Sequence, residues 1–277
     1  MKKLLPFFGA LALVLTSCSS DDSNDASASI KPSRITYLDG DSETSYFIDY
    51  KYDGNKIVSE TEDDGSTTKY TYTGDLITKK EDFGSDNQVD YTTEYTYTNG
   101  KVSSQIMKYS EIPGKNSSLS YYDKLKYTYN SDNTVSYEGF YVSASAGTEE
   151  KNGSYGTLTF QDGNLIKSVT TVNYGSTATY FYEYDTKNSP FKNVTGGSLL
   201  IDKGFEVSAH NITKYSGSSV SVDKKIGLSS HAAKSAASTS NPYINTFTYT
   251  YDSNDFPTEG KSFDSDGALR ETVKYTY

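Results

Sequence analysis

Most of this chain consists of short stretches in which large apolar and polar residues alternate. The stretch KYTYTGDLITKKEDF, from Lys69 to Phe83, places Tyr70 and Tyr72 on either side of one polar residue, followed by a Gly-Asp pair and a second apolar pair. Residues two apart in a β-strand point to the same face, so both tyrosines would share a face and Lys69 would lie on the other. Gly-Asp is typical of tight hairpin turns. The stretch therefore predicts one β-hairpin with a tyrosine-rich face and a charged face.

The same pattern recurs to the end of the chain. Its copies are YKYDGNKIV from Tyr50, YTYTGDLI from Tyr70, YTYTNGKV from Tyr95, YTYNSDNTV from Tyr127, LTFQDGNLI from Leu158, YEYDTKNSPF from Tyr182, YTYDSNDFP from Tyr249 and the terminal KYTY. Apart from one long interval, the copies lie 20 to 32 residues apart. Two strands of about eight residues with their turns occupy the shorter of these spacings. The repeat predicts an antiparallel up-and-down meander of about 14 to 17 strands.

A sheet of so many strands cannot stay flat, because sheets twist and long unpaired edges promote aggregation. We therefore expect an all-β fold over residues 34–277, in which tyrosine-rich hairpin repeats form one large sheet, curled or closed into a barrel-like shape. The chain has 27 tyrosines, each with a large apolar ring and a polar tip. We expect most of them to pack in the core and across strands, although exposed tyrosines could bind a ligand.

One interval, at about residues 190–245, interrupts the repeat. It contains VTGGSLLI, which suggests a short helical turn, two irregular strands near 205–207 and 212–215, and a Ser/Ala-rich stretch from Gly227 to Pro242 that reads as a long loop. Such an interval is either a tolerated surface insertion or a binding loop. If a binding site exists, we expect it here, and its candidate residues are Tyr215, His210 and His231.

The N-terminus has the pattern of a targeting segment. Lys2 and Lys3 precede the apolar run LLPFFGALALVL, which is too short to span a bilayer, and LTSC follows. This arrangement resembles the lipobox of bacterial lipoproteins, which implies cleavage after residue 17 and acylation of Cys18. The alternative is ordinary secretion with a free thiol. Cys18 is the single cysteine of the chain and lies where a lipobox requires it, so residues 1–17 are expected to be a lipoprotein signal peptide.

Residues 18–33 form a polar, acidic and Ser-rich stretch that predicts a flexible tether. Acidic residues directly behind the cysteine resemble the surface-export signal of Bacteroidota-type lipoproteins, which implies an outer-membrane lipoprotein exposed at the cell surface. The alternative is a plain solvated linker. After cleavage the chain would carry 24 basic against 36 acidic residues, a net charge of −12. This charge argues against a nucleic-acid partner and leaves acyl chains on Cys18 as the expected contact with the membrane.

Two motifs carry a further resemblance. YKYDGNKIVSE and YTYDSNDFPTEG are similar to the YD (tyrosine-aspartate) repeat of Rhs-type proteins, although Thr73, Thr98 and Asn130 replace the aspartate in three copies. The combination YDTKNSPFKNV, HNITKYSG and YTYTYDSNDFPTE resembles a Bacteroidota lipoprotein family of unknown function, described as DUF4595-like and porin-like in fold. The resemblance implies an architecture and identifies no activity.

Residues with catalytic potential form no recognisable motif in the sequence. G-x-S-x-G, P-loop and H-E-x-x-H motifs are absent, and the two histidines have no ligand partners at metal-binding spacing. FDSDGAL at Phe263 resembles a calcium loop, but Ser262 and Val273 stand at its first and twelfth positions, so a tight turn is favoured. A glycosidase-like carboxylate pair could be formed by the fold, yet nothing in the sequence selects one. We predict no cofactor, no metal and no enzymatic activity.

The closing VKYTY resembles the terminal strand of outer-membrane barrels. A lipid-facing strand needs uniformly apolar alternate positions, whereas stretches such as TTKYTYT and TYLDGDSETSYFIDYKYD place Thr and charge on both faces. Another half repeat is therefore the favoured interpretation. Taken together, the patterns predict a lipid-anchored cell-envelope protein with a non-catalytic structural or binding role, its ligand an extracellular glycan or peptide. The alternatives are a barrel that carries an apolar ligand and, less favoured, a glycan-acting hydrolase.

Overall fold

Each sequence repeat forms an antiparallel hairpin, as the pattern predicts. The computed structural model describes residues 30–40, 45–110, 120–172, 175–222, 237–239 and 243–277. Seventeen strands lie within them: β1 (Arg34–Asp39), β2 (Ser45–Asp53), β3 (Lys56–Glu62), β4 (Thr67–Thr73), β5 (Leu76–Phe83), β6 (Val89–Thr98), β7 (Lys101–Tyr109), β8 (Tyr121–Tyr129), β9 (Thr134–Ser143), β10 (Glu149–Gln161), β11 (Asn164–Val172), β12 (Ser176–Tyr184), β13 (Ile212–Val222), β14 (Ala237–Thr239), β15 (Tyr243–Tyr251), β16 (Pro257–Phe263) and β17 (Leu269–Thr276).

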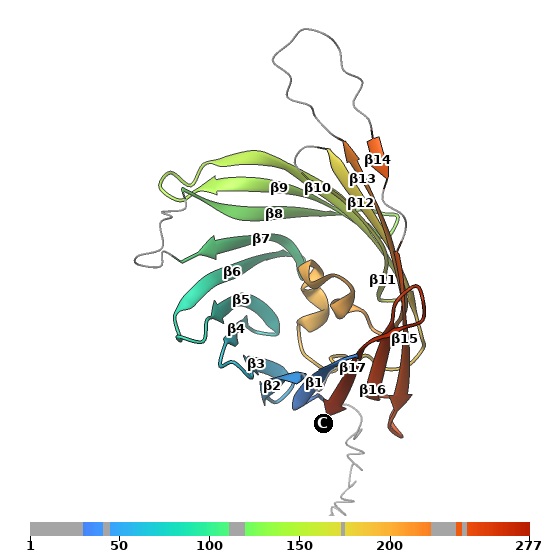
Figure 1. The fold of residues 1–277 in the computed structure, drawn as a ribbon. Coiled ribbons are helices and arrows are strands. Elements are labelled where there is room, and N and C mark those ends of the chain that lie inside the picture. Colours follow the sequence, from blue (N-terminus) through green and yellow to red (C-terminus); the bar gives the residue numbers. More distant parts are fainter. Residues whose placement is uncertain (1–29, 41–44, 111–119, 173–174, 223–236, 240–242) are drawn as a thin grey trace, which may run out of the picture.

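The meander closes into a barrel (Figure 1). Neighbouring strands pair antiparallel in chain order, and β1 pairs with both β2 and β17, so the first and last strands complete the ring. The short strand β14 pairs with the far end of β13, while β15 pairs with the near end. The predicted antiparallel meander is therefore confirmed, and of the two expected forms, curled or closed, the structure shows the closed one.

Alternation along the strands places the tyrosines inside the barrel. Tyr50, Tyr70, Tyr95 and Tyr127, the first tyrosines of four repeats, are 5–9% exposed and belong to the hydrophobic core. The apolar residue after each turn, such as Ile57 or Ile77, joins them in that core. Lys69 and Thr71, which flank Tyr70 in the sequence, are exposed on the outer face. The prediction that most Y-x-Y pairs serve packing is confirmed for these copies.

The second tyrosine of a pair has a different role, because its hydroxyl reaches the backbone of a neighbouring strand. The Tyr97 hydroxyl donates to the Ile77 carbonyl at 2.7 Å, beyond the point where backbone pairing of β5 with β6 ends. The carbonyls of Pro32, Leu165 and Pro257 accept in the same way from Tyr52, Tyr184 and Tyr277. Each hydroxyl thus satisfies a backbone group where the strands separate.

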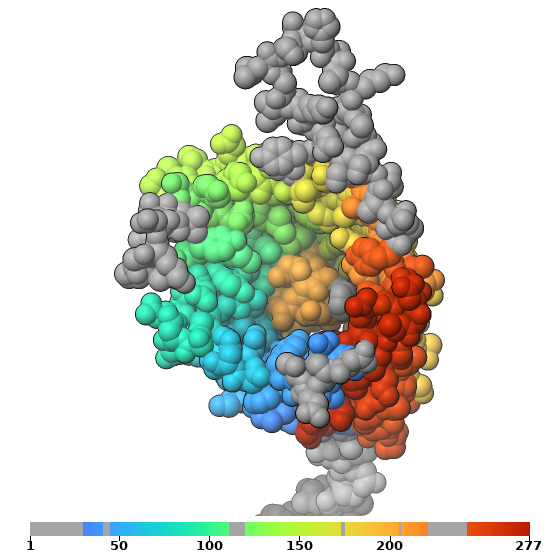
Figure 2. Space-filling model, viewed as in Figure 1, coloured from blue at the N-terminus to red at the C-terminus, as the bar shows by residue number. Residues whose placement is uncertain are grey.

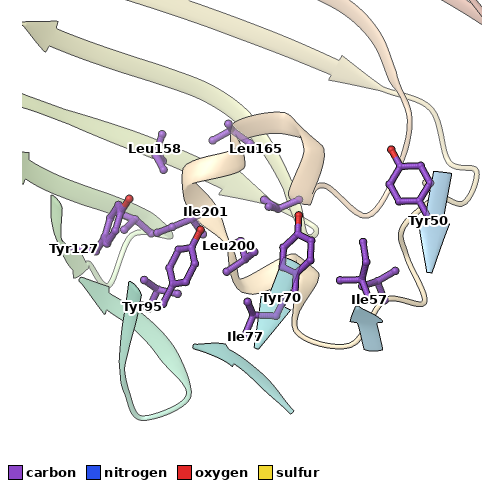
Figure 3. Packing of buried hydrophobic residues seen from close by; sticks show 14 of the residues in the cluster. Tyr50, Ile57, Tyr70, Ile77, Tyr95, Tyr127, Leu158, Leu165, Leu200 and Ile201 are labelled. Atoms are coloured by element: carbon purple, nitrogen blue, oxygen red, sulfur yellow. The ribbon is translucent and has the colours of Figure 1, made fainter. Parts of the chain in front are cut away.

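The interruption of the repeat folds into the barrel rather than over its surface. Residues 190–211, here called the inner segment, connect β12 to β13 and include the 3₁₀ turns η2 (Gly197–Leu199) and η3 (Ile201–Val207). Figure 3 shows Leu200 and Ile201 among the core side chains of the wall. The helical turn expected in VTGGSLLI is confirmed by η2. The expected strand near 205–207 is wrong, because the chain there forms η3, in which Ile201 and Val207 pack in the core in place of strand pairing.

The rest of the interval differs in part from expectation. The strand expected near 212–215 is the beginning of the longer β13. Most of the loop expected from Gly227 to Pro242 lies outside the described residues, and Ala237–Thr239 within it form β14. The tether up to residue 29 lies outside them as well. No helix in the described residues is long and apolar enough to cross a membrane.

Candidate functional site

The interior of the barrel is hollow beside the inner segment. Figure 2 looks into the ring of strands and shows the gold-coloured atoms of the inner segment within it. Ile201 and Val207 of η3 are buried against the wall, whereas Asp202 and Glu206 of the same turn are exposed. Water therefore reaches these two carboxylates inside the barrel. We call this space, with the inward-facing tyrosines around it, the chamber.

One wall of the chamber is a group of four tyrosines on β12, β13 and β15. Tyr215 stacks against Tyr180 and Tyr182, with ring centroids 5.5 and 5.4 Å apart. Its hydroxyl shares a short hydrogen bond with that of Tyr243, whose ring lies edge-on to it. A side chain at Gly217 would collide with the rings of Tyr180 and Tyr243, so this glycine allows the rings to lie on the backbone. We call these four residues the tyrosine platform.

Tyrosine pairs also line other parts of the inner wall. Tyr37 on β1 and Tyr46 on β2 stack nearly parallel at 4.5 Å, and Tyr121 on β8 packs against Tyr141 on β9 at 4.4 Å. Unlike the tyrosines of the core, several tyrosines of the inner wall keep much of their surface in contact with water. Their exposed fractions are 45% for Tyr46, 42% for Tyr121, 42% for Tyr243 and 38% for Tyr109. The chamber therefore offers ring edges and hydroxyl groups to a molecule inside it.

Charged groups of the inner segment are tied to the wall by tyrosines. The Lys203 ammonium donates to the Tyr70 hydroxyl at 3.0 Å, which in turn donates to Glu60 at 2.7 Å. The Tyr95 hydroxyl donates to Asp202 at 3.0 Å. The surrounding protein limits the solvation of Asp202 and raises its pKa, an effect that the bond from Tyr95 and the nearby Lys203 only partly offset. These contacts fix η3 against β3, β4 and β6.

The site residues predicted from the sequence do not lie together in the structure. Tyr215 lies on the inner wall, as a binding residue must. His210 precedes β13, and its ring Nδ1 lies 2.9 Å from the Asn164 amide nitrogen, a contact that fastens the inner segment to β11. His231 and Cys18, the lipidation site predicted from the sequence, lie outside the described residues. Tyr215 and His210 therefore do not form one site.

Sequence reasoning missed Tyr180 and Tyr243 as partners of Tyr215. The signal was present in the alternation of TYFYEY and YINTFTYTY, which places aromatic residues at alternate positions except at Asn245. What the sequence lacked was the register, in which Tyr182 pairs with Tyr215 and Tyr180 and Tyr243 both pair with Gly217. Register across three strands decides which rings meet.

Among the described residues, neither a metal site nor a small pocket is a stronger candidate for the functional site. In the part of the chain that the structure describes, no three His, Cys, Asp or Glu side chains gather as a metal site would require. A cleft of about 380 Å³ lies where β7 and β8 separate, lined by Thr98, Asn99, Lys101, Ser103, Tyr127 and Tyr129. It has no carboxylate, and its ammonium group, from Lys101, lies over the Tyr129 ring. The chamber is therefore the candidate site.

Comparison with known proteins identifies relatives in fold alone. No family model matches the chain, and no curated protein matches it. The chain is similar to the crystal structure of a porin-like protein from Bacteroides vulgatus ATCC 8482, with a TM-score of 0.54, 16% sequence identity, and 90% of this chain and 98% of that chain covered. The likeness establishes the fold. A porin-like protein from Bacteroides uniformis ATCC 8492 also matches, with a TM-score of 0.48 and 13% identity over 88% of this chain and 96% of that one.

Proposed function

We propose that this protein is a non-enzymatic, lipid-anchored protein of the cell envelope whose barrel binds a glycan in its chamber. The observation that carries the proposal is the chamber itself, in which partly exposed tyrosines surround two water-accessible carboxylates. Sugars present hydroxyl groups and apolar C–H faces. Tyrosine rings and hydroxyls, together with carboxylate acceptors, match that chemistry.

The outer wall supports a barrel that stands in water rather than in lipid. Outward-facing charges pair across its strands, as in Lys108 with Glu94, Lys124 with Glu149 and Lys214 with Glu183, at 2.7 to 2.8 Å. A lipid-facing band would have to bury these charges in hydrocarbon, which costs several kcal/mol, about 2 to 4 for each Lys near the midplane. A tether from an acylated Cys18, as expected from the sequence, would hold such a barrel at a membrane without inserting it.

The alternatives fit the chamber less well. An apolar ligand would displace water from Asp202 and Glu206 without replacing their hydrogen bonds, which is unfavourable. For a hydrolase, the hydrogen bonds of Tyr70 to Glu60 and of Tyr95 to Asp202 assign these carboxylates to holding η3 on the wall. Both observations favour binding over transport of an apolar molecule and over acid–base catalysis.

Calorimetric titration with a panel of soluble oligosaccharides tests the proposal. We expect at least one oligosaccharide to bind, and Tyr243→Ala and Tyr215→Ala each to weaken its affinity by about ten-fold through loss of one ring contact. The matched control is Tyr155→Ala, because Tyr155 pairs with Glu138 on the outer face and is 55% exposed. Circular dichroism verifies that each variant is folded. The proposal fails if no oligosaccharide binds, or if Tyr155→Ala weakens binding as much as the platform variants.

A further inference from the structure

The chamber carries an excess of negative charge on its inner wall. Register places acidic side chains beside inward-facing residues of β2, β6, β9 and β16: Glu60 pairs with Tyr50, Glu62 with Ile48, Asp82 with Tyr91, Asp123 with Tyr141 and Glu271 with Ser262. Asp202 and Glu206 of η3 add to them. The ammonium group of Lys80 lies 3.3 Å from the Asp82 carboxylate, and that of Lys203 lies 3.8 Å from the Glu60 carboxylate. These two lysines neutralise part of the negative charge.

The imbalance is greatest around the stacked pair of Tyr37 and Tyr46. Burial is the main cause that raises the pKa of both phenols, and Glu206 and Glu271 add to it at Tyr37, as Glu271 and Glu62 do at Tyr46. Register places Glu271 on β17 and Glu62 on β3 on the same inner face as this aromatic pair, and Tyr46 is 45% exposed there. Tyrosine faces and carboxylates both attract a cation.

The carboxylates themselves are partly desolvated, and they also repel one another. Burial raises the pKa of Glu206, and neighbouring Glu60 and Asp202 raise it further, against the opposing effect of Lys203 and Lys80. Burial likewise raises the pKa of Glu62 and Glu271, with Asp63 and Asp64 adding to the effect at Glu62 and Asp39 adding to it at Glu271. A positively charged ligand would relieve this repulsion on binding, whereas a negatively charged ligand would increase it.

We propose that the chamber selects glycans that carry free amino groups, with the ammonium groups attracted to Glu62 and Glu271 beside Tyr37 and Tyr46, and the sugar rings along the inner tyrosines. This inference rests on the proposed function and adds the class of ligand. A glycan of acidic sugars is excluded by the same charges.

A matched set of oligosaccharides tests the selection. Hexamers of glucosamine, N-acetylglucosamine, glucose and galacturonate are titrated into the protein at one pH and low salt. We expect the glucosamine hexamer to bind at least about ten-fold more tightly than the two neutral hexamers, and galacturonate to bind least. The preference should shrink at high salt, because ions screen charges that water can reach.

Two variants locate the selection in the chamber. Glu62→Gln with Glu271→Gln should reduce the preference for the glucosamine hexamer to less than about three-fold while leaving binding of the neutral hexamers unchanged. The control is Glu138→Gln with Glu183→Gln, which removes the same charge from the outer wall, where these residues pair with Lys151 and Lys214. The outer variant should retain the preference.

The outcomes separate the two proposals. If neutral and amino hexamers bind equally, the inference fails and glycan binding stands. If no hexamer binds, the proposed function fails as well. If the outer-wall variant loses the preference and the chamber variant keeps it, the attraction is a property of the net charge and the inference is wrong.

Discussion

At the scale of single residues, the tyrosine repeat combines two tasks in one short phrase. The first tyrosine of a pair packs in the core, and the second uses its hydroxyl to satisfy a backbone carbonyl about one repeat earlier in the chain. An aliphatic residue could perform the first task but not the second. This explains how a chain with few aliphatic residues can close a large barrel.

Removing one of these hydroxyls should cost stability without changing the fold. Tyr97→Phe leaves the Ile77 carbonyl without its partner in a partly buried position, and we expect the free energy of unfolding to fall by about 1 to 2 kcal/mol. Urea denaturation measures the change. Tyr155→Phe, on the outer face, should change it by less than about 0.5 kcal/mol, and equal effects of the two variants would contradict the assigned role.

The path of the inner segment into the barrel depends on the backbone conformation of Gly196. Its φ is +77°, and an added Cβ would lie 2.7 Å from the Asp75 carbonyl oxygen. We expect Gly196→Ala to destabilise the protein by about 2 kcal/mol or more, from the left-handed backbone and the collision together. Gly54→Ala, at a φ of +57° with open space around it, should cost only about 1 kcal/mol. Thermal or urea unfolding of the two variants provides the comparison.

At the scale of elements, the inner segment decides what the barrel can do. Its apolar side chains fill the barrel at the end of the Y-x-Y turns, and its exposed carboxylates face the remaining space. The segment is fastened at both ends, by Thr195, whose amide donates to the Asn55 carbonyl, and by Ser208, whose hydroxyl accepts from the Leu165 amide. The inner segment is therefore a fixed boundary of the chamber.

The carboxylates of the inner segment should make the stability of the protein depend on pH. Because the surrounding barrel limits the solvation of Asp202 and Glu206 and raises their pKa values, the folded state binds protons more tightly than the unfolded state, and stability falls as the pH rises above their ordinary range of about 4. We expect a higher melting temperature at about pH 5 than at about pH 8. Glu206→Gln should reduce this difference and the outer-wall control Glu183→Gln should not. The opposite slope would contradict the assigned burial.

At the scale of the whole molecule, the hairpins and a large curled or closed sheet could be predicted from the sequence, whereas closure itself and the contents of the interior could not. Period-two alternation and Gly/Asn turns are local signals, so Tyr70, Tyr72 and the turn after them could be predicted. The inner segment depends on contacts between residues more than 100 positions apart, such as Tyr95 with Asp202, and its loop-like composition gives no sign of burial. The tyrosine platform was missed because strand register lies beyond local pattern.

The charged outer wall predicts how the protein is distributed between the membrane fraction and the soluble fraction. We expect the mature protein in the membrane fraction through lipidated Cys18, and the Cys18→Ala protein in the soluble fraction. Fractionation followed by sedimentation with phosphatidylcholine vesicles measures both. A Cys18→Ala protein that remains with the vesicles would contradict both the anchor and the water-facing wall.

The central claim is that ligands bind inside the barrel, and site-directed blocking of its two faces tests it most directly. Ala178 pairs with Ser219 on the inner face beside Tyr180, and the next residue, Thr179, lies on the outer face. Each is changed to cysteine in a Cys18→Ser background, labelled with a bulky maleimide, and titrated with the oligosaccharide that the unlabelled protein binds. We predict that the label at Ala178→Cys abolishes binding and that the label at Thr179→Cys leaves it intact. Loss of binding with the outer label alone would contradict the account.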